Sequence, residues 1–295
     1  MESIWLSDAG GGRVCLKLES LQQSHSFKSR GAFNAVISRI ERGRALKHVV
    51  TASAGNHGRA LAAACERFRL PLIVFTPDDA PKTKLAAIKR HGAELRSEGR
   101  DYDHAERLAL AYARETGAEF ISPYNDADVV AGAGTVALEL FEDAPDLDGI
   151  VVPIGGGGLI SGVAVVAKAV APSCEVIGVE AEVSCAFLTG IRAGRLVEIV
   201  PGATIADGLG GNPDPATITF AFVQKLVDRV VTVSEDDLAA AIRGLAESEH
   251  LIAEGAGAAA VGAILRRRME PGGRFLAALV TGGNIDRARL ATLLR

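Results

Sequence analysis

The sequence predicts an α/β protein whose mainly parallel β-strands are covered by helices. Short runs rich in β-branched residues alternate with Ala-rich amphipathic stretches along the chain, and this alternation is typical of strand followed by helix. Repeated strand–helix–strand units form parallel sheets with helices on both faces. At 295 residues and 48% hydrophobic composition, the chain is also long enough to bury a large core. The expected strands lie at residues 14–18, 49–52, 72–75, 94–96, 150–154, 176–179, 230–233 and 275–280.

We expect two domains that share this chain by interleaving. Neither an internal repeat nor a low-complexity linker divides the sequence into successive segments. Residues 1–47 and 125–295 are expected to form a larger domain, and residues 48–124 a smaller, mobile one. Because parallel sheets bind ligands beyond the carboxyl ends of their strands, the loops that follow strands are the candidate site.

Composition limits the expected partners. The 32 Lys and Arg residues nearly balance the 36 Asp and Glu residues, for a formal net charge of -4, so the chain lacks the charge that attracts nucleic acid or an acidic membrane surface. A small molecule and a second copy of the chain, in a homodimer, are the expected partners. No apolar run reaches the ~18 residues of a membrane span, and no secretion signal begins the chain. A cytoplasmic location is expected, which the lack of C-x-x-C spacing among the four cysteines also favours.

One lysine stands in an unusual segment before an expected helix at 33–40. Lys28 lies among hydroxyl side chains and Phe27 in the sequence SHSFKSRGA, which begins at residue 24. Taken alone, such a lysine is more commonly a solvated residue in the first turn of a helix. Its interpretation therefore depends on the other loops.

A second loop has the character of an anion-binding helix start. The expected strand at 49–52 runs into SAGNHG, and an Ala-rich helix is expected at 59–68. Small residues let a ligand approach the backbone, and free N–H groups at a helix N-terminus favour a carboxylate or a phosphate. Asn56 as a simple helix cap and His57 as a core histidine are the alternatives.

Two glycine-rich loops follow later strands. Gly155, Gly156, Gly157 and Gly158 lie between an apolar strand and the helix expected at 159–170, where they can turn consecutive N–H groups toward one phosphate. The sequence matches neither the P-loop nor the G-x-G-x-x-G pattern, so a single phosphate group is the expected ligand. The other loop, TGGNID from residue 281, follows the last strand and on its own is an ordinary turn.

Together these segments resemble the threonine dehydratase and serine racemase group of pyridoxal-phosphate enzymes. They read SFKSRGA from residue 26, SAGNHG from 53, GGGG from 155 and TGGN from 281, in the order of that family and across almost the whole chain. The resemblance implies a tryptophan synthase β-like fold of two interleaved, open, twisted sheets, with pyridoxal 5'-phosphate as the cofactor.

The resemblance also implies a role for each matching residue. Lys28 resembles the lysine that forms an imine with the cofactor, and Phe27 the residue packed against the ring. Asn56 resembles the side chain bonded to the phenolic oxygen, and Thr281 the hydroxyl residue that faces the pyridine nitrogen. The candidate catalytic residues are Lys28, Ser53 and His57. The substrate carboxylate would bind at the loop of Ser53, Ala54, Gly55, Asn56 and His57, and the cofactor phosphate at Gly155 to Gly158 and Leu159. Glu254 resembles a family acid near the cofactor.

The implied activity is elimination of water from L-threonine or L-serine, which gives a 2-oxo acid and ammonia. The cofactor supplies the electron sink, and the freed amine of Lys28 would remove the α-proton. A neutral hydroxyl at Thr281 cannot hold a proton on the pyridine nitrogen as a carboxylate would. The sink is thereby moderated, which favours loss of a β-leaving group over transamination.

Three departures from the family pattern modify this expectation. Racemases of the group carry Ser at the position of Ala54, and a methyl group cannot move a proton, so a dehydratase is favoured. The family's divalent cation would meet Glu180, the Ser184 carbonyl and position 186, where Ala186 replaces a carboxylate, so we expect little or no activation by Mg²⁺. Because the sequence ends soon after Asp286, the regulatory domain of biosynthetic threonine dehydratases is not expected.

Other functions stay open at this point. One is a dehydratase of another β-hydroxy amino acid, such as 3-hydroxyaspartate, with Tyr124 and His57 as candidate specificity positions. Another is a serine racemase, and a third is a non-catalytic relative that binds the cofactor. Cysteine synthase is disfavoured because the motif of that group is similar to SGNTG, whereas this chain has AGNHG at the same place.

Overall fold

Two parallel sheets organise the molecule. The computed structural model describes residues 1–266 and 272–295. The larger sheet has the order β1-β9-β6-β7-β8, with β1 Arg13–Leu18, β9 Phe275–Val280, β6 Gly149–Pro153, β7 Glu175–Ala181 and β8 Arg229–Val233. The smaller sheet has the order β4-β3-β2-β5, with β4 Glu94–Gly99, β3 Leu72–Pro77, β2 Val49–Ala52 and β5 Glu119–Phe120. Since all these strand pairs are parallel, the predicted α/β class is confirmed.

The larger sheet is assembled from both ends of the chain. β1 pairs with β9 along its whole length, from Arg13 opposite Phe275 to Leu18 opposite Val280. The four strands of the smaller sheet come from residues 49–120, between those two ends. Two interleaved sheets were expected, and this is what the topology has. The domain boundaries after residues 47 and 124 stay a prediction.

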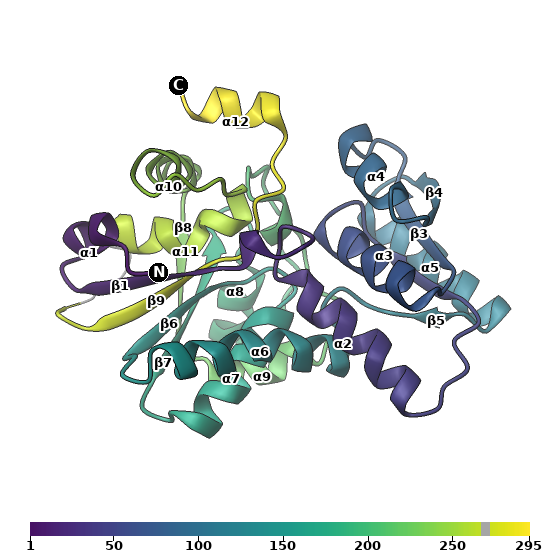
Figure 1. The fold of residues 1–295 in the computed structure, drawn as a ribbon, viewed down its shortest axis with the longest axis horizontal. Coiled ribbons are helices and arrows are strands. Elements are labelled where there is room, and N and C mark those ends of the chain that lie inside the picture. The colour runs from purple at the N-terminus through teal and green to yellow at the C-terminus, as the bar shows by residue number, and fades with distance from the viewer. Residues whose placement is uncertain (267–271) are drawn as a thin grey trace.

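Helices bury both faces of the larger sheet. Along β9, Leu276 and Ala278 belong to one hydrophobic cluster, whereas Ala277 and Leu279 belong to the other, because successive side chains of a strand point to opposite faces. The first cluster includes residues of α1 (Ile4–Gly10), α10 (Glu235–Ser248) and α11 (Gly255–Leu265). The second includes residues of α6 (Ala127–Asp143), α7 (Gly158–Val170), α8 (Ala186–Ala193) and α9 (Thr219–Leu226), and Figure 1 shows α6, α7 and α9 on the side of the sheet away from α10.

The smaller sheet is covered in the same way. α3 (Asn56–Phe68) and α4 (Lys82–Lys89) contribute to the cluster on one face, and α5 (Tyr102–Thr116) to the cluster on the other. α2 (Lys28–Glu41) packs against both α3 and α6. α2 therefore lies where the two sheet units meet (Figure 1).

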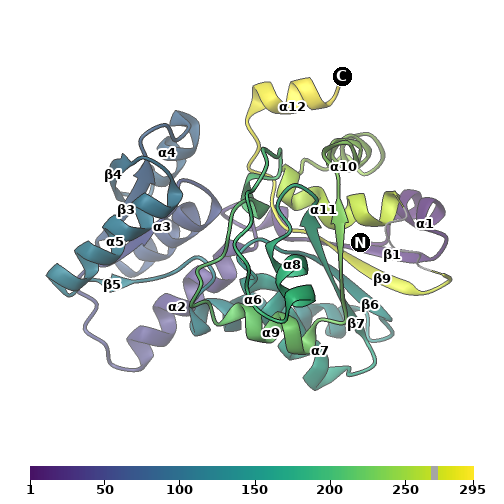
Figure 2. The same ribbon diagram turned by 180° about the vertical axis from the view of Figure 1, so that it is seen from behind.

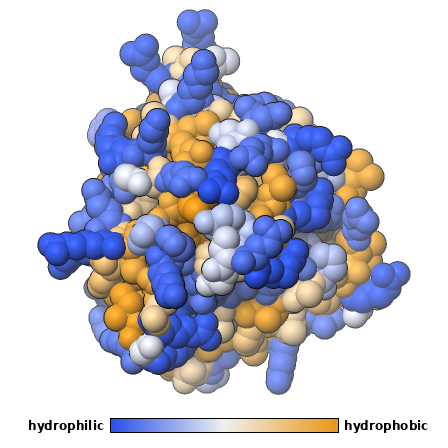
Figure 3. Space-filling view, turned by 90° about the vertical axis from the view of Figure 1, so that its right-hand side faces the viewer, coloured by the Kyte–Doolittle hydropathy of each residue, from blue (hydrophilic) through white to orange (hydrophobic). Residues whose placement is uncertain are grey.

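Polar and charged side chains cover much of the outer face of the smaller-sheet end of the molecule, with apolar ones among them (Figure 3).

Three helices begin earlier than the sequence predicts. α2 begins at Lys28, α3 at Asn56 and α7 at Gly158, where the apolar pattern predicted starts at residues 33, 59 and 159. The additional first-turn residues are polar or small, so apolar periodicity does not reveal them. β5 was not expected either, because two residues are too few to show a strand pattern. The consequence is that Lys28 and Asn56 sit at helix N-termini.

The remaining elements are short. The 3-10 helices are η1 (Glu19–Leu21) and η2 (Asp207–Leu209), and the last helix is α12 (Arg287–Leu293). Figure 2 shows the long segment between α8 and α9, which carries η2, on the side of the larger sheet toward the smaller one. Among the described helices, none is long and apolar enough to cross a membrane.

Candidate active site

Lys28 places an amine at the junction of the two sheet units. Its Nζ donates a hydrogen bond of 2.7 Å to the Pro123 carbonyl oxygen and lies 5.1 Å from the centre of the Phe27 ring. Burial lowers the pKa of Lys28 to about 8, because a charged ammonium is disfavoured where water is excluded. A larger share of this amine is therefore neutral near pH 7 than for an exposed lysine, as a nucleophile or base requires.

The four glycines form a tight turn at the start of α7. Gly157 has φ +81 and precedes the helix without a side-chain cap. A Cβ at Gly155 would overlap the Gly208 carbonyl oxygen, and one at Gly156 would overlap the Tyr124 ring. Only glycine fits these positions, and the N–H groups of the first turn of α7 have no partner within the helix. This cradle suits one phosphate group.

Lys28 and the glycine turn face the same region through two consecutive residues. Pro123 accepts the hydrogen bond from Lys28, and the ring of Tyr124 packs directly on Gly156. The Tyr124 hydroxyl accepts a hydrogen bond of 2.9 Å from the Asp214 backbone N–H. One short stretch of main chain therefore sets the amine and the phosphate cradle side by side.

The loop after β2 forms the wall from the smaller sheet. Ser53 is buried, and its Oγ accepts a hydrogen bond of 3.2 Å from the Gly55 N–H. Asn56 and His57 occupy the first turn of α3, which starts with free N–H groups. Ala54, between them and Ser53 in sequence, brings no polar side chain. The loop thus offers backbone donors and one hydroxyl to a carboxylate.

His57 is a buried, neutral imidazole. Its Nε2 lies 3.2 Å from the Ile121 carbonyl oxygen, and its Nδ1 has no partner among the described residues. Burial first, and then the charge of Lys28, lower the pKa of His57 to about 3. Since a carbonyl only accepts, Nε2 carries the proton and Nδ1 is an acceptor. His57 therefore adds no positive charge to the site.

The end of β9 closes the site from the larger sheet. The Thr281 carbonyl accepts a hydrogen bond of 3.0 Å from the Phe27 N–H, and Ser26 and Gly282 form an isolated antiparallel bridge. The lysine segment is thereby tied to the loop that carries Thr281, whose side chain is buried. Two of the sequence motifs are in direct contact through their backbones.

Glu254 lies against Asn56. Its Oε1 accepts a hydrogen bond of 2.6 Å from Asn56 Nδ2, and its backbone N–H donates to the Gly282 carbonyl at 3.0 Å. Burial raises the pKa of Glu254 to about 7. The acid that the family resemblance picks out is thus in contact with both the Asn56 loop and the Thr281 loop.

Glu180, in β7, and Ser184, just after that strand, have structural partners. The two carboxylate oxygens of Glu180 accept hydrogen bonds of 2.9 and 2.8 Å from the N–H groups of Phe187 and Leu188, so Glu180 caps the start of α8. The Ser184 hydroxyl accepts one of 3.0 Å from Gly211. Across the residues that the structure describes, no group of three His, Cys, Asp or Glu side chains could hold a metal ion.

Sequence reasoning missed several residues that meet the site. The Pro123 carbonyl follows β5, a strand too short to be recognised. Arg59 donates to Asn284, which in turn donates to Asn56. Asn284 belongs to the TGGN motif but received no role of its own, and Arg59 directly follows the SAGNHG motif, so only the folded structure reveals the contact between them.

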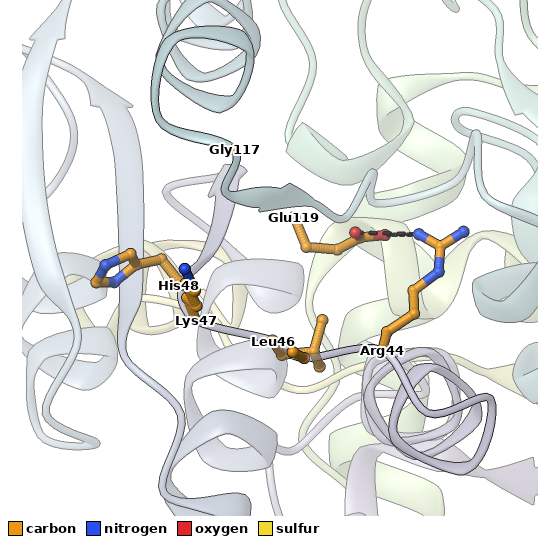
Figure 4. A pocket seen from close by; sticks show the side chains of 7 residues that line it. Arg44, Leu46, Lys47, His48, Gly117 and Glu119 are labelled. Atoms are coloured by element: carbon orange, nitrogen blue, oxygen red, sulfur yellow. Dashed lines mark hydrogen bonds and ion pairs between the residues drawn. The ribbon is translucent and has the colours of Figure 1, made fainter.

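A separate hollow lies at the opposite end of α2 from Lys28. It has a volume of about 240 Å³ and is lined by Arg44, Ala45, Leu46, Lys47, His48, Gly117 and Glu119. Figure 4 shows Arg44 reaching Glu119, which it meets as an ion pair at 2.9 Å. None of the residues around Lys28 lines this hollow, so it is not part of the candidate site.

Known proteins resemble the chain along nearly its whole length. A family model for pyridoxal-phosphate dependent enzymes matches residues 2–282. An L-threonine ammonia-lyase of Thermotoga maritima is 42% identical over 283 residues, which are 95% of this chain and 69% of that protein. An L-threo-3-hydroxyaspartate ammonia-lyase of Saccharomyces cerevisiae is 35% identical over 294 residues, 100% of this chain and 90% of that protein. The structure of maize serine racemase has a TM-score of 0.93 at 32% identity, covering 99% of this chain and 89% of that one.

Proposed function

The chain belongs to the pyridoxal-phosphate-dependent enzyme family, and from this premise we propose that it eliminates water from L-threonine or L-serine. The products are a 2-oxo acid and ammonia. The observation that carries the proposal is the Lys28 amine, with its lowered pKa, beside the glycine turn of α7. Pyridoxal phosphate, when bound, supplies the electron sink that stabilises the carbanion left by loss of the α-proton.

The residues around the amine fit this cofactor. Gly155 to Gly158 and Leu159 would hold the phosphate with backbone N–H groups. A Cβ at Gly155 would collide with the Gly208 carbonyl oxygen and one at Gly156 with the Tyr124 ring, so glycine is needed for this turn. Thr281 would place a neutral hydroxyl at the pyridine nitrogen, and Asn56 would donate to the phenolic oxygen. Phe27, below the Lys28 amine, would pack against the ring. Lys28 would hold the cofactor covalently.

Lys28 is also the proposed base. Its free amine would take the proton from Cα. The hydroxyl oxygen would take the electron pair of its bond to Cβ together with a proton, which the cofactor phosphate would pass to it, and would leave as water. The low-dielectric surroundings that lower the pKa of Lys28 keep part of the amine unprotonated for this step. The Pro123 carbonyl gives the resulting ammonium a hydrogen-bond acceptor.

The substrate carboxylate is proposed to bind at the start of α3. The Ser53 hydroxyl and the N–H groups of the first turn are donors that a carboxylate needs, and the helix N-terminus favours negative charge. His57 lines this wall as a neutral residue rather than as a cation. Ser53 and His57 therefore act in binding and orientation.

Ala54 directs the outcome toward elimination. A methyl group offers no proton to the face of Cα opposite Lys28, so the carbanion is not reprotonated there by the protein. For this reason we propose a dehydratase rather than a racemase, although serine racemases share the fold.

The wider properties of the enzyme are proposals too. We propose a homodimer in the cytoplasm, with a larger domain of residues 1–47 and 125–295 and a smaller, mobile domain of residues 48–124. The interleaved sheets support the division into two domains, and the nearly balanced charge favours a small molecule and a second copy of the chain as partners. We also propose that no divalent cation is required, because backbone N–H groups already occupy both oxygens of Glu180.

One second substrate has specific support. The yeast relative is an L-threo-3-hydroxyaspartate ammonia-lyase, 35% identical over the whole chain. Its substrate carries a further carboxylate, which would need a donor near Cβ. Tyr124, whose ring packs on Gly156, and His57 are the residues that we propose to distinguish the two substrates.

A panel of substrates tests the function. Purified protein, reconstituted with pyridoxal phosphate, would be assayed for oxo-acid release from L-threonine, L-serine and L-threo-3-hydroxyaspartate. We expect turnover with the first two. Turnover of L-threo-3-hydroxyaspartate alone would make that compound the substrate in place of L-threonine and L-serine. No turnover of any of the three would reject the proposed elimination.

A further inference from the structure

Four side chains form a continuous line of hydrogen bonds that ends beside the proposed cofactor site. Arg59 Nη1 donates to Asn284 Oδ1 at 2.6 Å. Asn284 Nδ2 donates to Asn56 Oδ1 at 2.7 Å, and Asn56 Nδ2 donates to Glu254 Oε1 at 2.6 Å. We call this line, from Arg59 through Asn284 and Asn56 to Glu254, the amide relay. It joins α3 to the loop after β9.

The orientation of the Asn284 amide is fixed from two sides. A guanidinium carries donors and no acceptor, so Arg59 can meet only the oxygen of that amide. The Ser24 carbonyl, which lies 2.8 Å from Asn284 Nδ2, only accepts and can meet only the nitrogen. Both partners require the same orientation. The two hydrogens of Asn284 Nδ2 are then used, one on Ser24 and one on Asn56.

That orientation determines the amide of Asn56 in turn. Its Oδ1 must accept from Asn284, so its Nδ2 lies on the other side, where it donates to Glu254. An amide nitrogen has two hydrogens, and Glu254 takes one. One N–H of Asn56 is therefore left for a ligand. Gly282 allows this approach, since a Cβ there would overlap Glu254 Oε1 and lie 3.3 Å from Asn56 Nδ2.

We propose that Arg59 and Asn284 are positioning residues, which hold Asn56 with an N–H rather than its oxygen toward the cofactor's phenolic oxygen. This inference rests on the proposed function, because it takes Asn56 as the partner of that oxygen. A phenolic oxygen that carries negative charge needs a donor, whereas a turned amide would present an acceptor and repel it. Neither Arg59 nor Asn284 has to touch the cofactor to have this effect.

Arg59 is placed for such a task and not for an ordinary surface contact. Burial lowers its pKa, and its Nε has no partner among the described residues. Removing a cation from water is costly unless it is well paired. In this relay the guanidinium meets a neutral amide and thereby fixes its polarity.

Replacing Asn284 by Asp tests the proposal most sharply. The introduced carboxylate would be an acceptor on every side, so Asn56 would turn its Nδ2 toward it and bring its Oδ1 to the site. We expect Asn284→Asp to weaken pyridoxal phosphate binding roughly tenfold to a hundredfold, the loss expected for a hydrogen bond to a charged group. The visible absorption band of the bound cofactor should also lose intensity to its ultraviolet band.

Substitutions at Arg59 give an independent reading with a matched control. Arg59→Met removes the donor and should weaken cofactor binding roughly threefold to tenfold, as for one neutral hydrogen bond. Arg59→Lys keeps a donor-only group and should restore both affinity and spectrum. Arg67→Met makes the same change at an exposed position of the same helix and should leave both unchanged. Circular dichroism of each apoprotein verifies folding, and if Asn284→Asp does not fold, the Arg59 pair decides.

The possible outcomes separate this inference from the proposed function. If Asn284→Asp and Arg59→Met bind the cofactor with the affinity and spectrum of Arg67→Met, the relay is overturned, whatever the enzyme's activity. The relay is also overturned if Arg59→Lys is as defective as Arg59→Met, because the donor would then not be what matters. If instead the wild type binds the cofactor but releases no oxo acid, the proposed function fails while the spectra still test the relay.

Discussion

Replacing Gly157 by Ala should damage the phosphate-binding turn for two separate reasons. Gly157 has φ +81, and an L-residue in this left-handed region costs about 1–2 kcal/mol. A Cβ there would lie 2.7 Å from Phe187 Cζ and 2.8 Å from Thr219 Oγ1, and relieving such overpacking costs about 1–3 kcal/mol. The two contributions together predict a loss of about 2–5 kcal/mol in the free energy of unfolding.

Two other glycines separate these contributions. Gly194 has φ +72 with nothing within 4 Å of an added Cβ, so Gly194→Ala should cost only the backbone part, about 1–2 kcal/mol. Gly210 is extended, with the nearest atoms 3.7 Å from an added Cβ, so Gly210→Ala should change stability by less than about 0.5 kcal/mol.

The assay combines urea unfolding of the apoproteins with titration of pyridoxal phosphate. Only Gly157→Ala should also weaken cofactor binding, by roughly tenfold or more, because it displaces N–H donors of the phosphate cradle. The reasoning would be refuted if Gly157→Ala matched Gly194→Ala in stability and kept the wild-type affinity for the cofactor.

Three further predictions concern the reaction product, the pH dependence of cofactor capture and activation by Mg²⁺. Ala54→Ser should raise D-serine formation from L-serine, followed by chiral chromatography alongside pyruvate, with cofactor affinity nearly unchanged; abundant D-serine from the wild type would instead favour a racemase. The rate at which the apoprotein captures pyridoxal phosphate should rise with pH and level off above about 8, because capture needs the neutral amine of Lys28. Stopped-flow absorbance measures this rate, and a flat profile from about pH 6 to about pH 9 would be inconsistent with the lowered pKa of Lys28. Mg²⁺ should activate the enzyme little, and Glu180→Ala should cost about 1–2 kcal/mol of stability through the lost cap of α8; saturable activation that disappears in Glu180→Ala would reveal a cation site.

The fold follows from the sequence wherever a strand is long and buried on both faces. β2 and β9 begin and end at the predicted residues, because continuous runs of apolar or β-branched residues are bounded by polar ones, His48 and Ser53 for β2 and Arg274 and Thr281 for β9. β5 was missed since its two residues carry no period. Helix starts were placed late for α2, α3 and α7, because the residues that open them serve the site and interrupt the apolar pattern.

The candidate site was predictable as a set of loops but not as a set of contacts. The loops after β2, β6 and β9 carry motifs that sequence alone singles out. The sequence does not show how these loops contact one another. The Phe27 N–H donates to the Thr281 carbonyl, and Asn56 bonds to both Glu254 and Asn284. Each of these hydrogen bonds joins residues at least 198 positions apart. The pairing of Glu180 with two backbone N–H groups likewise depends on where α8 begins.

The most direct test of the central claim is the rate of oxo-acid release by wild type and Lys28→Ala, both saturated with pyridoxal phosphate. The account predicts release from L-threonine and L-serine by the wild type, and none above background from Lys28→Ala. Lys28→Ala should still bind the free cofactor, because the cradle uses backbone N–H groups of Gly155 to Gly158 rather than the lysine. A normal rate of oxo-acid release by Lys28→Ala would contradict the assignment of Lys28 as the residue that carries the cofactor and removes the α-proton.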